Sequence, residues 1–98
     1  MEIIKNIQGN TCNISLIGRL DTTTAPKLEA ELKSSLNNIN ELVLDFAKLE
    51  YISSAGLRVL LSAQKVMNAQ GSMKICNVCS EIMEVFEITG FTDILTIA

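Results

Sequence analysis

The chain has 98 residues, of which 48% are hydrophobic and 19% charged, and it carries a net charge of −3 without any histidine. These values predict one small globular domain over residues 1–98 and argue against disorder. No cluster of Lys and Arg is present to neutralise phosphates, so we expect no binding to nucleic acid. No apolar run of about 18 residues and no basic start followed by an apolar stretch is visible, so we expect a cytoplasmic protein without membrane attachment.

The three cysteines are an odd set, which favours reduced thiols in the cytoplasm over a disulfide framework. Cys76 and Cys79 have the spacing of a redox or metal motif, but no fourth ligand completes a metal site and histidine is absent. The stronger interpretation is that these cysteines are small apolar residues close to the end of a buried strand. We therefore expect no metal, no cofactor and no catalytic residue, with a small redox protein as a minor alternative.

Two strands open the predicted fold. Residues 3–8 have strand character, and Gly9 with Asn10 suits a two-residue hairpin turn. Apolar and polar side chains alternate over residues 12–17, so one face of this strand is buried and the other is at least partly wet. Helices are therefore not expected to cover both faces of the sheet.

Three amphipathic helices and further strands follow. After a loop at 18–24, the sequence predicts a helix at 25–36, with Pro26 in its first turn, and a strand at 42–46. A second helix is predicted from the serines at 53 and 54 to about Gln70, followed by a strand at 73–78. A third helix is capped by Ser80 and ended by Gly90, and a short strand at 94–97 is an optional last element. Strand–helix–strand steps favour right-handed crossovers between parallel strands. The predicted architecture is α/β, with a mixed four- to five-stranded sheet and all helices packed on one face.

Two serines stand where a buried strand runs into the second helix. The first N–H groups of a helix have no internal partner and the helix dipole is positive there, so a phosphate on such a serine would be well accommodated. A serine before an apolar helix is more often only a cap. The sequence leaves open whether Ser53 or Ser54 is the capping residue.

Two segments together resemble a known family. Residues 52–61, Ile-Ser-Ser-Ala-Gly-Leu-Arg-Val-Leu-Leu, are similar to the signature of STAS domains, in particular of the anti-sigma factor antagonists, whose usual form is hydrophobic, Asp, Ser, Ser or Thr, Gly, Leu. Residues 17–25, with Gly18 and Asp21, resemble the family's other recurring element. With the order of elements, the resemblance covers essentially the whole chain and implies a STAS-like fold.

The resemblance implies a phosphorylation switch. In the family, an anti-sigma kinase phosphorylates the serine two places before the glycine, which is Ser54 here. The unphosphorylated antagonist binds the anti-sigma factor and releases the sigma factor, phosphorylation blocks this binding, and a PP2C-type phosphatase restores it. The chain departs from the usual pattern at Ser53, where the family has an acid, and at Ala55, where it has Ser or Thr. The implied partner-binding residues are Asp21, Ser53, Ala55, Gly56 and Arg58.

Other interpretations stay open. Asp21 precedes a run of threonines, so it equally suits a turn or helix start. Asp45 follows a predicted central strand and is a weaker candidate, either as a loop acceptor or as part of the surface around Ser54. The alternative to a switch is a non-switching STAS scaffold or docking module.

Overall fold

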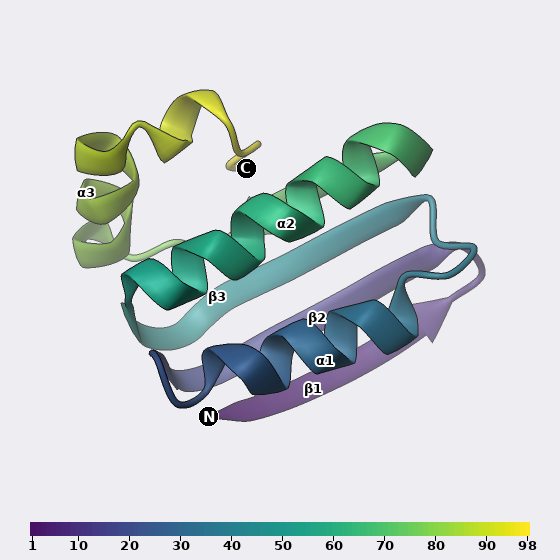
Figure 1. The fold of residues 1–98 in the computed structure, drawn as a ribbon, viewed down its shortest axis with the longest axis horizontal. Coiled ribbons are helices and arrows are strands. Elements are labelled where there is room, and N and C mark those ends of the chain that lie inside the picture. Colours follow the sequence, from purple (N-terminus) through teal and green to yellow (C-terminus); the bar gives the residue numbers. More distant parts are fainter.

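The computed structural model describes residues 1–98 (Figure 1). In chain order the elements are β1 (Glu2–Gln8), β2 (Thr11–Leu20), α1 (Ala25–Ser35), β3 (Glu41–Ile52), α2 (Ser54–Gln70), β4 (Ser72–Cys76), α3 (Ser80–Thr89) and a short 3₁₀ helix (Phe91–Asp93). This order confirms the predicted succession of strands and helices up to α3.

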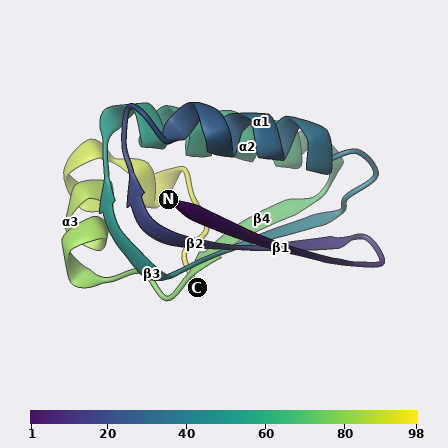
Figure 2. The ribbon, with the colours of Figure 1, turned by 90° about the horizontal axis from the view of Figure 1, so that it is seen from below.

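The four strands form one mixed sheet in the order β1-β2-β3-β4. β1 and β2 are antiparallel, while β2, β3 and β4 run parallel. Figure 2 shows α1 and α2 lying together over one face of the sheet, with α3 at one end of the molecule. The buried ring of Phe86 in α3 lies 6.4 Å from that of Phe46 in β3, so α3 also packs on the helix-covered side. The predicted mixed sheet with helices on one face is confirmed.

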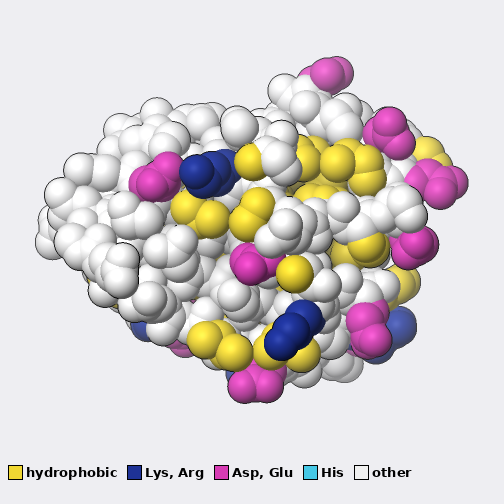
Figure 3. All heavy atoms as spheres, turned by 180° about the vertical axis from the view of Figure 1, so that it is seen from behind, with side chains coloured by type: hydrophobic (Ala, Val, Ile, Leu, Met, Phe, Trp, Pro, Cys, Tyr) yellow, Lys and Arg dark blue, Asp and Glu magenta, His cyan; other side chains and the backbone are white.

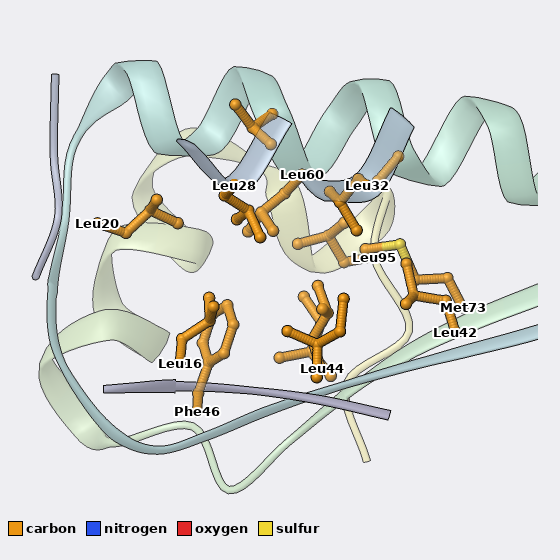
Figure 4. Packing of buried hydrophobic residues seen from close by; sticks show 14 of the residues in the cluster. Leu16, Leu20, Leu28, Leu32, Leu42, Leu44, Phe46, Leu60, Met73 and Leu95 are labelled. Atoms are coloured by element: carbon orange, nitrogen blue, oxygen red, sulfur yellow. The ribbon is translucent and has the colours of Figure 1, made fainter. Parts of the chain in front are cut away.

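The core fills the layer between the helices and this face of the sheet. Figure 4 shows Leu28, Leu32 and Leu60 pointing from α1 and α2 toward Leu42 and Leu44 of β3. The alternation in β2 has the predicted result, because Cys12, Ile14 and Leu16 are fully buried while the residues between them are half-buried. The same alternation over residues 41–46 of β3 places every second side chain under the helices.

β2 and β3 are longer than predicted. Residues 18–20 continue β2, and β3 runs on past Phe46 to Ile52. The pairing register shifts between Ser15 and Ile17 and again after Gly18, whose φ is +105°. Extra residues at such bulges bend a strand and break its alternation, which removes the sequence signal for a strand. In Figure 2 the same part of β3 curves up toward the helix layer.

Two further expectations about the carboxyl-terminal third were wrong in detail. The cap residue of α3 is Cys79 rather than Ser80, whose hydroxyl donates to Glu81 Oε1 (2.9 Å) instead of to the helix backbone. The optional short strand at 94–97 is only an isolated bridge between Ile97 and Ile75, closed by hydrogen bonds from Ile75 N–H to Thr96 O (2.9 Å) and from Ala98 N–H to Ile75 O (2.8 Å). Glycine ends α2 and α3 as predicted, with Gly71 after α2 and a left-handed Gly90 after α3.

No helix covers the opposite face of the sheet. Figure 3, drawn from behind, shows separate hydrophobic patches among scattered charged side chains. A shallow hollow of about 190 Å³ on this face is lined by β1, β2 and β3 residues including Ile4, Ile17 and Lys48. None of the helices is long and apolar enough to cross a membrane.

Candidate functional site

The two serines at the start of α2 have different structural roles. Ser53 is the cap residue, in extended conformation, and its Oγ accepts a hydrogen bond from Gly56 N–H (3.4 Å). Ser54 is the first helical residue and is exposed. Its hydroxyl makes no hydrogen bond to the protein. The question that the sequence left open is answered: capping belongs to Ser53, which leaves the Ser54 hydroxyl accessible.

Close packing holds this helix start against the ends of β2 and β3. Ser53 N–H donates to Leu20 O (2.8 Å), which joins the loop to the end of β2. Gly56 is buried, and a Cβ atom at this position would lie 2.7 Å from Leu20 Cγ and 2.9 Å from Ile52 Cγ1. Gly56 therefore positions the serines through packing and presents no surface of its own to a partner.

The other residues of the first turn of α2 lie around Ser54. Ala55 is half-buried, and Arg58 is exposed with no ion-pair partner in the chain. Arg58 follows Ser54 by four residues, so the two side chains share one face of the helix. The first intrahelical bond runs from Leu57 N–H to Ser53 O (3.0 Å), which leaves the preceding N–H groups at the positive end of the helix dipole. This arrangement can accept an anionic group on Ser54.

Asp21 has an evident structural role. Its Oδ1 accepts from Thr23 N–H (3.0 Å), the Thr23 hydroxyl (2.8 Å) and Thr24 N–H (3.1 Å). These bonds, the Thr23 hydroxyl above all, hold the pKa of the Asp21 carboxyl below its usual value, although partial desolvation opposes them. The turn into α1 thus depends on Asp21, as the second interpretation of this residue expected. Its Oδ2 is left for other contacts.

One pair of residues next to this site was not among the predicted candidates. Arg19 and Tyr51 lie opposite each other in the β2–β3 pairing. The Arg19 guanidinium carbon lies 4.2 Å from the centroid of the Tyr51 ring, and its Nε lies 3.8 Å from Asp21 Oδ2. The sequence does not reveal this pair, because the shorter predicted strands leave both residues in loops. The pairing becomes visible only in the structure, where β2 continues to Leu20 and β3 to Ile52.

Asp45 and the cysteines lie away from the Ser54 surface. Asp45 sits in the middle of β3, where its Oδ1 accepts from Ala47 N–H (2.9 Å) and Asn77 Nδ2 (3.0 Å), so it supports the bulge and the β4–α3 turn. All three thiols are free. Burial raises the pKa of Cys76 and the nearby Asp45 carboxylate raises it further, which disfavours the reactive thiolate. The geometry thus favours neither Asp45 as a partner residue nor Cys76 as a nucleophile.

Comparisons of the sequence with curated proteins identify relatives of this chain. The chain is 42% identical over 85 residues to BtrV, a candidate anti-sigma factor antagonist of Bordetella bronchiseptica, across 85% of this chain and 73% of BtrV. It is 30% identical over 98 residues to the anti-sigma-B factor antagonist of Listeria monocytogenes, across 96% of this chain and 84% of that protein.

Solved structures show the same fold at low sequence identity. The unphosphorylated form of the anti-sigma factor antagonist SpoIIAA matches 99% of this chain and 87% of its own, with a TM-score of 0.78 and 17% identity. An anti-sigma factor antagonist from Mycobacterium paratuberculosis matches 98% of this chain and 83% of its own, with a TM-score of 0.88 and 18% identity. The family model described as the STAS domain matches residues 2–98. From the mixed sheet, the capped start of α2 and these matches it follows that the chain belongs to the STAS domain family.

Proposed function

We propose that this protein is an anti-sigma factor antagonist that regulates sigma-factor-dependent transcription by binding an anti-sigma factor with serine-kinase activity. In this proposal Ser54 is the phosphorylated residue, a PP2C-type phosphatase removes the phosphate, and the exchange takes place in the cytoplasm without nucleic acid or membrane. The protein itself acts by binding and catalyses no reaction. Relatives at 42% and 30% identity that carry this role in their names support it.

The observation that carries the proposal is that the two serines at the start of α2 have different structural roles. Because Ser53 caps α2, the Ser54 hydroxyl is not needed to cap the helix. It is exposed, so a kinase can reach it. Among the solved relatives of the same fold, SpoIIAA is described in both an unphosphorylated and a phosphorylated form.

A phosphate on Ser54 would act on partner binding and leave the fold intact. It adds about −1.5 to −2 charges at neutral pH, and a helix N-terminus stabilises such charges. A partner that packs over the start of α2 would have to desolvate this charge, which costs several kcal/mol when the charge is left unpaired. A loss of about 3 kcal/mol already lowers affinity more than a hundredfold.

The decisive experiment is phosphopeptide mapping. The chain is incubated with Mg-ATP and, in turn, each anti-sigma factor of the serine-kinase type encoded in the same genome. We expect one kinase to add a single phosphate, on Ser54. Ser54→Ala should bind that kinase and accept no phosphate, whereas Ser54→Asp should keep its stability and lose binding about a hundredfold or more. Label on Ser53, or on neither serine, would contradict the proposed switch, and binding without label would indicate a non-switching docking module.

The matched control is the neighbouring serine. Ser53→Ala removes a cap hydrogen bond and should lower the free energy of unfolding by about 0.5–1 kcal/mol, at the low end for caps because the bond is long. It should still accept phosphate on Ser54. Ser53→Asp restores the family's acid and keeps a good cap, so its stability should match the natural chain. Urea unfolding of the two Ser53 variants and the natural chain separates the capping role from the switch.

A further inference from the structure

We propose that Arg19 and Tyr51 form a recognition pair on the Ser54 surface, which selects a partner that presents a carboxylate to the Arg19 guanidinium beside an apolar side chain packed on Tyr51. This inference rests on the proposed function, since it adds two residues to the surface that the anti-sigma factor would cover. Neither residue is among the partner-binding residues that the family resemblance implies.

The position of the pair follows from the strand ends. Leu20 and Ile52 point into the core beneath Gly56, so their neighbours Arg19 and Tyr51 point to the outside, next to the loop that carries Asp21 and the start of α2. Tyr51 precedes Ser54 by only three residues. A protein interface of ordinary size buries about 800 Å² on each partner, so a partner centred on Ser54 reaches both side chains.

Both side chains of the pair are exposed to a partner. Tyr51 is 40% exposed, and the side chain of Arg19 is 59% exposed. Tyr and Arg are the residue types most enriched among those that dominate binding energy. In this chain they are the only exposed aromatic and the only arginine stacked on an aromatic ring.

Arg19 is already held in place before a partner arrives. The Tyr51 ring supports one face of the guanidinium, and Asp21 Oδ2 lies 3.8 Å from its Nε. The hydrogen bonds from Thr23 and Thr24 in turn fix Asp21. No side-chain hydrogen bond within the chain uses the Arg19 donors, and a guanidinium presents its free donors in a fork that matches a carboxylate. A fixed side chain loses little conformational entropy on binding, so the pair favours an acidic partner group.

The test measures binding of unphosphorylated chain to the kinase that labels Ser54, in its ADP-bound form, by titration calorimetry. We expect Arg19→Ala and Tyr51→Ala each to weaken binding about tenfold or more. Tyr51→Phe keeps the ring and should bind like the natural chain. Lys65→Ala is the charge-matched control, because Lys65 is exposed near the other end of α2 and should not alter affinity. Arg19→Glu should bind worst, and exchanging one acid of the kinase for Lys should restore its binding.

The two proposals fail in different ways. Natural affinity in both Arg19→Ala and Tyr51→Ala overturns the recognition pair, whatever Ser54 does, and so does a loss confined to one of them. A Ser54→Asp variant that binds as tightly as the natural chain overturns the proposed switch, while weakened Arg19→Ala and Tyr51→Ala would still support the pair. A chain that binds none of the kinases overturns both. Thermal unfolding of each variant checks that it is folded. We expect temperatures of unfolding close to that of the natural chain, because neither side chain is part of the core.

Discussion

At the scale of single residues, Asp21 links stability to pH. Its pKa is lowered in the folded chain, so its stabilising effect is fully present above the unfolded value of about 3.9 and is lost as the pH falls through the folded value. Asp21→Asn cannot ionise and should be less stable near neutral pH. Thermal unfolding between neutral pH and about pH 2 should therefore show the natural chain losing its advantage over Asp21→Asn in acid. A constant difference between the two over this range would contradict this account.

The sequence places two serines at the start of α2 but does not tell which of them is the cap residue. Either serine can cap a helix, and the choice depends on whether the helix starts one residue earlier or later. Only the backbone conformation of Ser53 and its bond to Gly56 N–H decide it. The same limit produced the error at Ser80, where Cys79 takes the cap position of α3 without a side-chain bond.

At the scale of elements, two glycines set how closely α2 approaches its neighbours. Gly56→Ala places a methyl group against the buried side chains of Leu20 and Ile52, so we expect a net loss of about 1–2 kcal/mol after the gain in helix propensity. Gly71→Ala places its Cβ within 1.8 Å of the Asn40 carbonyl oxygen, which is backbone and cannot move aside. This variant should lose about 3 kcal/mol or more in guanidinium unfolding. Equal losses for the two would contradict the packing described.

The elements most fully predicted are those with a regular hydrophobic period. The helix stripe Ala25, Leu28 and Leu32 is buried, as its spacing predicts. The extension of β3 is different, because Leu49 and Ile52 are buried at a spacing of three residues after the bulge. This spacing matches no strand pattern, since the bulge changes which side chains face the core. For that reason the Arg19–Tyr51 pair could not be found from the sequence.

At the scale of the whole molecule, α3 is attached to the core chiefly through Ile82 and Phe86. Phe86 is fully buried against Phe46, so Phe86→Ala should cost about 3–5 kcal/mol, a large part of the stability of a small domain. Ile88 lies two residues further along the same helix and is 77% exposed, so Ile88→Ala should stay within about 0.5 kcal/mol of the natural chain. Denaturant unfolding of both variants checks this, and similar losses for the two would contradict the packing of Phe86 against Phe46.

The short bridge between Ile97 and Ile75 has a consequence for how the sheet meets other molecules. It lies on the outer side of β4, where the N–H and C=O groups of Ile75 are already paired with residues 96–98. β1, at the other border of the sheet, pairs only with β2, and its Lys5 ammonium is directed inward to Glu31 (2.7 Å) and the Ser35 hydroxyl (2.8 Å) of α1. Unpaired strand borders are where chains recruit further strands. A strand added from another molecule would therefore meet a border at β4 that is partly paired through Ile75, and a border at β1 that is unpaired.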